Sequence, residues 1–187
     1  MRLFVALEIP SAVREAYSTL IRELRPLAPQ AKWVRAENLH LTLKFVGEVP
    51  NPKSDAIRSA LAGARTEGAL DLSFCGLGFF PSEKRPRVFW AGIESDPRLA
   101  GLAAEIESCL APLGIAREGR AFTAHLTLAR FRDPRVPEKF LVAVRGLQTH
   151  PFGKLLAKEF FLIESRLKPS GAEYTSLASF PLATTEA

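Results

Sequence analysis

The stretch His40-Leu41-Thr42-Leu43 occurs a second time as His125-Leu126-Thr127-Leu128, 85 positions further along the chain. The same offset pairs Arg2 with Arg87, Phe4 with Phe89, Ala6 with Ala91, Arg35 with Arg120 and Ala36 with Ala121. Matches at both ends of a strand-helix-strand unit under one offset favour a duplication over coincidence. We therefore predict a single domain over residues 1–187, with an internal repeat in which residues 2–46 match 87–131.

The first copy of the motif lies in a stretch that alternates between apolar and polar residues, as a half-buried strand does. The apolar set is Leu39, Leu41, Leu43 and Phe45, and the polar set is Asn38, His40, Thr42 and Lys44. Two repeated units that share a core are normally related by an approximate two-fold axis, so equivalent residues face each other. We expect the histidines and threonines of both copies to line one cleft, above their leucines.

Strand and helix patterns are mixed along the rest of the chain, with no clean linker between them. Apolar and alternating segments predict further strands at 2–9, 69–79, 86–94, 123–131, 154–167 and 173–180. Apolar residues at helical spacing predict helices from Ser11 to Pro26, within 52–65, from Asp96 towards Gly114, and over 137–145.

The composition is that of a globular protein. Of 187 residues, 47% are hydrophobic and 24% charged, which excludes a disordered or low-complexity chain. Two cysteines, Cys75 and Cys109, are too few for a disulfide framework or a four-cysteine zinc site, and they favour a reducing compartment. No apolar run reaches the ~20 residues that span a bilayer, so we expect a cytoplasmic protein. The net charge of +5 agrees with an anionic partner.

Two histidines in one cleft suit the hydrolysis of a phosphodiester. The unperturbed pKa of histidine lies near neutrality, so one imidazole can accept a proton while the other donates one at the same pH. Threonine hydroxyls two residues further along the same strand face would donate hydrogen bonds to the non-bridging oxygens. This scheme needs no metal or other cofactor, and the acidic residues form no close cluster that would bind a metal.

Arg130 breaks the symmetry between the two copies, because the same offset places it at the position of Phe45. A guanidinium close to the phosphate would stabilise the charge of the transition state. Strict alternation puts Arg130 on the face opposite His125 and Thr127. It therefore reaches the cleft only if the strand twists, bulges or ends there.

The paired motifs and their flanks resemble a known family. The segments that carry the resemblance are Arg2-Leu3-Phe4-Val5-Ala6, Glu37-Asn38-Leu39 with the first motif, Arg85-Pro86-Arg87-Val88-Phe89-Trp90, the second motif with Ala129-Arg130, Glu164-Ser165-Arg166-Leu167 and Gly171-Ala172-Glu173-Tyr174. The family is the 2H, or two-histidine, phosphoesterases, and within it the chain is similar to RNA 2′,3′-cyclic phosphodiesterases, formerly called 2′-5′ RNA ligases. One departure is Ala124, where the family often has a proline before the second histidine.

The resemblance implies a bilobal α+β fold in which two antiparallel sheets, flanked by helices, enclose a central cleft. It also implies a metal-independent RNA 2′,3′-cyclic 3′-phosphodiesterase that opens a cyclic phosphate to leave a 2′-phosphate. The partner would be an RNA or oligonucleotide with a cyclic phosphate end. No obligate protein partner is implied, and we expect a monomer.

The family's site residues carry over onto matching positions of this chain. His40 becomes the proton donor to the leaving 3′ oxygen, and His125 becomes the proton acceptor that activates water. The phosphate-binding positions are matched by Thr42, Thr127 and Arg130. No position for a metal is implied.

An aromatic side chain near the cleft usually stacks on the terminal base in this family. Phe4 and Phe80 are the candidates for that role here. Trp33 and Trp90 lie in apolar or alternating segments that are typical of core residues. Of the two tryptophans, Trp33 is the better candidate for a contact with the cleft.

Two other functions stay open at this point. The same site could join RNA ends through a 2′-5′ bond, which is the reverse of hydrolysis. A non-catalytic module could use the cleft only to hold an RNA or nucleotide phosphate, although binding alone does not require two equivalent histidines.

Overall fold

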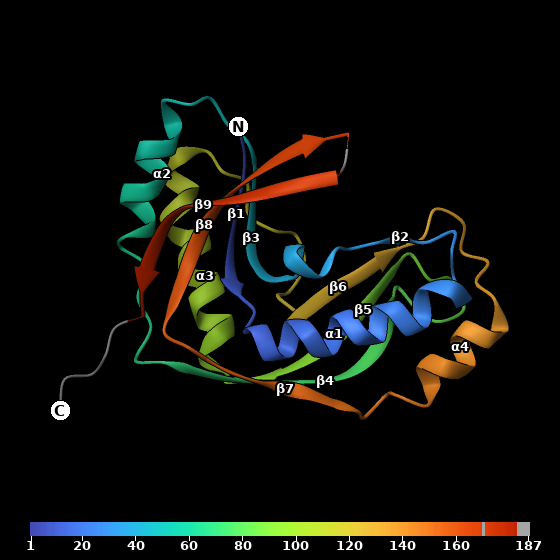
Figure 1. Ribbon diagram of the computed structural model, residues 1–187. Helices are drawn as coiled ribbons and strands as arrows, with labels where there is room; N and C mark the ends of the chain where they lie inside the picture. Colours follow the sequence, from blue (N-terminus) through green and yellow to red (C-terminus); the bar gives the residue numbers. More distant parts are fainter. Residues whose placement is uncertain (170, 183–187) are drawn as a thin grey trace.

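The computed structural model describes residues 1–169 and 171–182, and within them the strands form two antiparallel sheets (Figure 1). The first sheet has the order β3-β1-β8-β9, and the second has the order β2-β6-β5-β4-β7. The first comprises β1 (Arg2–Glu8), β3 (His40–Glu48), β8 (Glu159–Lys168) and β9 (Gly171–Pro181); the second comprises β2 (Lys32–Trp33), β4 (Leu70–Phe80), β5 (Val88–Ser95), β6 (His125–Arg130) and β7 (Pro151–Ala157). The expected α+β fold with two antiparallel sheets is confirmed.

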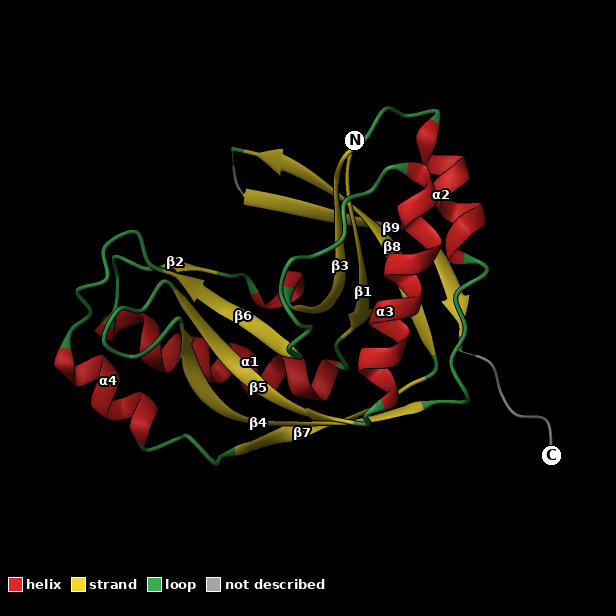
Figure 2. Cartoon of the chain, turned by 180° about the vertical axis from the view of Figure 1, so that it is seen from behind, coloured by secondary structure: helices red, strands yellow, loops and turns green. Residues whose placement is uncertain are grey.

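The α-helices flank the two sheets (Figure 2). They are α1 (Ser11–Leu24), α2 (Lys53–Leu61), α3 (Arg98–Leu110) and α4 (Glu138–Arg145), with short 3-10 helices at η1 (Arg25–Leu27), η2 (Ala36–Asn38) and η3 (Ala111–Leu113). α1 packs against β7 of the second sheet, whereas α3 contacts both β3 of the first sheet and α2. No helix in the described part of the chain is long and apolar enough to cross a membrane.

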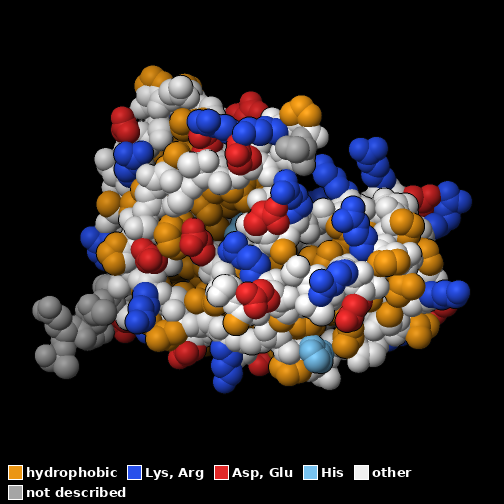
Figure 3. Space-filling view, viewed as in Figure 1, with side chains coloured by type: hydrophobic (Ala, Val, Ile, Leu, Met, Phe, Trp, Pro, Cys, Tyr) orange, Lys and Arg blue, Asp and Glu red, His pale blue; other side chains and the backbone are white. Residues whose placement is uncertain are grey.

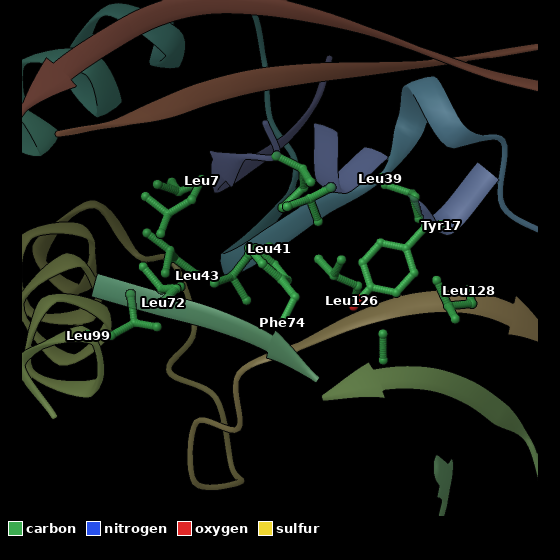
Figure 4. Close-up of a cluster of buried hydrophobic side chains, with 14 of the residues drawn as sticks. Leu7, Tyr17, Leu39, Leu41, Leu43, Leu72, Phe74, Leu99, Leu126 and Leu128 are labelled. Atoms are coloured by element: carbon green, nitrogen blue, oxygen red, sulfur yellow. The ribbon is translucent and has the colours of Figure 1, made fainter. Parts of the chain in front are cut away.

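One hydrophobic core joins the two sheets (Figure 4). Leu41 of β3 and Leu126 of β6 point into it, together with Tyr17 of α1 and Phe74 of β4. Tyr17 also stacks on Phe152 of β7, with ring centroids 4.6 Å apart. Burying a large apolar side chain contributes about 1.5–3 kcal/mol, so the leucines of the two histidine motifs help to hold the lobes together.

Two strand predictions need correction. The predicted strand at 154–167 is two strands, because β7 ends at Ala157 and pairs with β4 whereas β8 begins at Glu159 and pairs with β1 and β9. The chain passes from the second sheet to the first between Ala157 and Glu159, so one continuous apolar run in the sequence forms a strand in each sheet. The short strand β2 was not predicted, since two residues show no periodicity.

The register of β1 and β5 departs from the offset of 85. Glu8 lies opposite His40 in the first sheet, and Gly92 lies opposite His125 in the second. Glu8 and Gly92 are 84 positions apart, whereas the two histidines are 85 apart. Phe4 and Phe89, which the sequence offset pairs, therefore point to different sides of their sheets. In the sheets, the residues of β1 and β5 that occupy equivalent positions beside the two motifs are thus 84 rather than 85 positions apart.

Candidate active site

The two histidine motifs lie on β3 and β6, neighbouring strands where the two lobes meet (Figure 1). Both strands send their leucines into the shared core. His40 and His125 stay partly exposed on the opposite side of their strands, as do Thr42 and Thr127. We call this side the site face of each sheet. The surface is hollowed between the two lobes, with apolar side chains in the floor of the hollow and charged ones on its rim (Figure 3).

A β-bulge interrupts the alternation of β3 directly after the first motif. Val5 pairs with Lys44 and Ala6 pairs with Thr42, which leaves Leu43 as the extra residue. Lys44 consequently turns into the interior, where it is 2% exposed, and Phe45 turns outward and is 54% exposed. The predicted apolar and polar sets are therefore wrong for these last two positions.

β6 carries a bulge at the equivalent position. Phe89 pairs with Ala129 and Trp90 pairs with Thr127, so Leu128 is the extra residue. Ala129 is buried, and Arg130 is exposed on the site face with Thr127. Strict alternation required a twist, a bulge or a strand end for Arg130 to reach the cleft, and β6 has a bulge.

The inward turn of Lys44 builds an ion cluster in which the ammonium is buried, Glu107 is mostly buried and Glu118 is half exposed. Its ammonium lies 2.6 Å from a Glu107 carboxylate oxygen and donates to the Ala116 carbonyl at 2.6 Å. A Glu118 carboxylate oxygen lies 3.4 Å away, and the Glu118 amide donates to Glu107 at 3.3 Å. Charges are kept in a protein interior only when they are paired and hydrogen-bonded. The cluster therefore ties β3 and α3 to the loop that leads into β6.

Both imidazoles are oriented by the same local contact. Nδ1 of His40 lies 2.8 Å from the Asn38 carbonyl, and Nδ1 of His125 lies 2.8 Å from the Thr123 carbonyl. A carbonyl oxygen only accepts hydrogen bonds, so Nδ1 carries the proton in each ring. Nε2 of each histidine is thereby left to accept or donate a proton on the site face.

His40 sits among aromatic rings. The Phe4 ring lies 4.5 Å from the imidazole, and the Tyr174 ring of β9 meets it edge-on at 5.1 Å and 81°. This burial lowers the pKa of His40 below its ordinary value, and the hydrogen bond with Asn38 opposes the shift. Sequence reasoning gave Tyr174 no role, although it lies in the Gly171-Ala172-Glu173-Tyr174 segment that carries part of the family resemblance.

His125 has different aromatic neighbours. The Phe80 ring of β4 meets its imidazole edge-on at 5.1 Å and 87°. The indole of Trp90 lies 5.2 Å from Phe80, and it occupies the space where a side chain on Gly78 would be. A Cβ at Gly78 would stand 2.3 Å from that indole, so this residue must be glycine for the tryptophan to lie flat on β4.

The structure revises the predicted aromatic roles. Phe4 is 4% exposed, because His40 and Tyr174 cover its ring, so little of it is free to stack on a base. Phe80 is partly exposed beside His125. Trp33 packs against buried phenylalanines of the core, and Trp90 rather than Trp33 lies beside the site. The expectation for the two tryptophans is thus reversed.

Arg130 of the second sheet acts electrostatically on Tyr174 of the first. Burial raises the pKa of Tyr174, and the charges of Arg2 and Arg130 act against that rise. The charge of Arg130 therefore acts on the tyrosine that contacts His40, although Arg130 belongs to the second sheet. Residues 1–169 and 171–182 contain no group of three or more His, Cys, Asp or Glu side chains placed to hold a metal ion.

Comparison with known families shows the family to which the chain belongs. The model of the family described as "LigT like Phosphoesterase" matches residues 7–90 and 92–174, which together make up most of the chain. The chain is a LigT-like phosphoesterase. This family belongs to the 2H superfamily, which confirms the resemblance inferred from the two motifs.

Curated relatives of this LigT-like phosphoesterase match it over nearly its whole length. The RNA 2′,3′-cyclic phosphodiesterase of Archaeoglobus fulgidus is 36% identical over 182 residues, which cover 96% of this chain and 99% of the relative. The RNA 2′,3′-cyclic phosphodiesterase of Thermus thermophilus is 37% identical over 190 residues, covering 97% and 90% respectively.

Solved structures of the family superpose closely on this one. A crystal structure of a protein of Thermus thermophilus gives a TM-score of 0.81 at 32% identity and covers the whole of both chains. The crystal structure of E. coli LigT complexed with 3′-AMP gives a TM-score of 0.78 at 30% identity, covering 97% of this chain and 98% of that one.

Proposed function

We propose that this LigT-like phosphoesterase hydrolyses the 2′,3′-cyclic phosphate at the end of an RNA strand and leaves a 2′-phosphate. The observation that carries the proposal is the pair of imidazoles on adjoining site faces, each held through Nδ1 and free at Nε2. The relatives named RNA 2′,3′-cyclic phosphodiesterase support the same reaction.

In the proposed mechanism, His125 acts as the base. Its Nε2 takes a proton from water, and the resulting hydroxide attacks phosphorus opposite the 3′ oxygen. The bond between phosphorus and the 3′ oxygen breaks while protonated His40 gives its Nε2 proton to that oxygen. Each histidine then returns to its starting state by exchanging a proton with solvent. General acid and base groups contribute about 10²–10⁴-fold each.

Thr42, Thr127 and Arg130 bind the phosphate in this proposal. The two hydroxyls donate to non-bridging oxygens, and the guanidinium stabilises the charge that accumulates on them. Phe80 is the candidate for stacking on the terminal base, because its ring is partly exposed beside His125. Phe4 instead forms the wall behind His40.

The lowered pKa of His40 shapes its role as the donor. Burial favours the neutral imidazole in the free enzyme, whereas a donor must start protonated. A bound cyclic phosphate carries a negative charge, and an opposite charge at contact distance raises the pKa of a histidine. We infer that substrate binding itself charges His40, which limits the donor form to the complex.

An RNA strand rather than a mononucleotide suits the charge around the site. Lys84 and Arg85 are exposed in the turn between β4 and β5, next to the strand end that carries Arg130. Arg87 donates to the Arg132 carbonyl, which places those two residues at the same end of the sheet. Basic side chains of this kind bind the phosphates of a nucleic acid strand.

The test is hydrolysis of a short RNA that ends in a 2′,3′-cyclic phosphate, in the presence of EDTA. Wild type is compared with His40→Ala and His125→Ala, and the product is examined for a 2′- or a 3′-phosphate. We expect a 2′-phosphate product, formed by wild type and about 10²–10⁴-fold more slowly by each variant. A 3′-phosphate would overturn the assignment of the leaving oxygen.

Two further outcomes concern the alternative functions. Folded wild-type protein that binds the RNA end but never turns it over would favour a phosphate-binding module. RNA half-molecules incubated with the enzyme provide the remaining comparison, because a product of joined length would favour 2′-5′ joining over hydrolysis.

A further inference from the structure

The β8–β9 hairpin reaches the first histidine through an aromatic contact. Tyr174 of β9 lies opposite Ser165 of β8, and its ring meets the His40 imidazole at 5.1 Å and the Phe4 ring at 5.1 Å. Phe4 packs on the imidazole from β1 at 4.5 Å. The imidazole is therefore held by two aromatic rings that come from different strands of the first sheet.

The same hairpin is linked to His40 by a second route. The Asn38 side-chain amide donates to the Ala172 carbonyl at 2.7 Å. The Asn38 backbone carbonyl accepts the Nδ1 proton of His40 at 2.8 Å. Asn38 thus connects the hairpin, 134 positions away in sequence, to the group that fixes the tautomer and direction of the imidazole.

We infer that Tyr174 is a positioning residue for His40, supplied by the β8–β9 hairpin through its ring. This inference rests on the proposed function, in which His40 donates a proton. The ring excludes water from the imidazole and limits its rotation, so that Nε2 stays aimed at the leaving oxygen. A misdirected donor loses rate even when substrate binding is unchanged.

Several charged and titratable groups face this histidine from the elements around it. Glu8 of β1 lies opposite it in the sheet, and Tyr174 contacts it from β9. Arg2 of β1 and Arg130 of β6 act on Tyr174. A substitution at Tyr174 removes the Tyr174 contact and leaves Glu8, Arg2 and Arg130 in place. The effect of Tyr174 on the titration of His40 can therefore be separated from the effects of these three groups.

The experiment compares Tyr174→Leu with Tyr174→Phe. Histidine titration followed by NMR gives the pKa of His40 in each variant, with His125 as the internal control. Steady-state hydrolysis of an RNA 2′,3′-cyclic phosphate gives kcat and KM. Thr175→Ala, an exposed neighbour on the same strand, is the matched control.

For Tyr174→Leu we expect kcat to fall roughly tenfold with little change in KM. The pKa of His40 should rise as water reaches the ring, while the titration of His125 should not move. Tyr174→Phe keeps the ring and should restore both the wild-type kcat and the wild-type titration of His40. A change confined to protein stability would not shift one histidine alone.

Folded Tyr174→Leu with wild-type kcat and an unmoved His40 titration would overturn the inference. So would Tyr174→Phe as slow as Tyr174→Leu, since the hydroxyl rather than the ring would then matter. If Tyr174→Leu does not fold, Asn38→Ala cuts the second link and should shift His40 in the same direction, and an unmoved His40 would again count against the hairpin. The NMR readout needs no turnover, so a wild type that fails to hydrolyse RNA would refute the proposed function separately.

Discussion

The two histidine strands share their construction up to the threonine and differ beyond it. In both β3 and β6 a histidine is anchored through Nδ1 to the carbonyl two residues earlier, and a bulge comes directly after the threonine. After the bulge, β3 buries Lys44 and exposes Phe45, whereas β6 buries Ala129 and exposes Arg130. The same backbone irregularity thus precedes a buried cation, Lys44, in the first sheet and an exposed cation on the site face, Arg130, in the second.

The largest expected effect separates the two histidines by role. His40→Ala and His125→Ala should each lower kcat/KM for the cyclic phosphate by about 10²–10⁴-fold. A substrate with sulfur in place of the leaving 3′ oxygen needs little protonation to depart. It should recover much of the activity of His40→Ala and little of the activity of His125→Ala, as measured by steady-state kinetics on both substrates.

The reverse pattern on the sulfur substrate would exchange the two roles, and equal recovery would abolish the distinction between them. Circular dichroism of both variants provides the control for folding.

Removing the buried cation tests a feature of the first sheet that the second sheet lacks, since Ala129 stands there at the position of Lys44. Lys44→Ala leaves the Glu107 carboxylate without its ammonium partner, and breaking a buried pair in this way costs about 3 kcal/mol of unfolding free energy. Urea denaturation measures this cost. The double change Lys44→Met with Glu107→Gln removes both charges and should be less destabilising than Lys44→Ala, because no uncompensated charge stays buried.

If Lys44→Ala is as stable as wild type, the cluster does not hold the loop before β6. Arg58→Ala on α2 is the control, because the Arg58 side chain is 47% exposed and lies 3.9 Å from its exposed partner Asp55.

The exposed positions after the two bulges give a second contrast. Arg130→Ala should lower kcat/KM about 10²-fold, since a preorganised donor to the developing charge is lost. Phe45→Ala, at the corresponding position of β3, should change kcat/KM by no more than a few fold. Arg130→Lys should recover part of the loss, because lysine keeps the charge but not the bidentate fork. Equal losses at both positions would contradict the asymmetry between the lobes.

The smallest effect concerns the basic end of the second sheet. Replacing Lys84 and Arg85 by alanine should slow hydrolysis of an RNA oligomer about fivefold and leave that of adenosine 2′,3′-cyclic phosphate unchanged. The dependence of log(kcat/KM) on log salt should become shallower by about 1.4, or 0.7 for each lost phosphate contact. Lys154→Ala with Lys158→Ala removes the same charge at and just after β7, which pairs with the half of β4 that lies away from this turn, and serves as control.

An equal loss on the mononucleotide would mean that the turn acts on the reacting phosphate rather than on the strand. No loss on either substrate would show that the RNA takes another path.

The two histidine motifs could be singled out because repetition marks them in the sequence, whereas the α+β fold with two antiparallel sheets was predicted from the family resemblance. The bulges could not, since an extra residue such as Leu43 or Leu128 is itself apolar and leaves no trace in the pattern. The sequence nevertheless indicated that Arg130 could reach the cleft only where the alternation of its strand is interrupted, and the structure has such an interruption.

The aromatic surroundings were predicted less well because they depend on which face of a strand a residue occupies. Phe4 and Phe89 match by the offset, yet the register shift between β1 and β5 puts one against His40 and the other in the core. Tyr174 comes from the far end of the chain, and its contact with His40 is set by the sheet order β3-β1-β8-β9.

That sheet order has a consequence for synthesis on the ribosome. β1 is synthesised before both of its partners, and it pairs with β3 on one side and with β8 on the other. Until residues near 165 have been translated, one edge of β1 presents unpaired backbone groups to the cell. His40 likewise lacks Tyr174 and the Asn38–Ala172 bond until then. A nascent chain can thus contain both histidine motifs and still lack part of the surroundings of His40, which β9 supplies only after both motifs have been made.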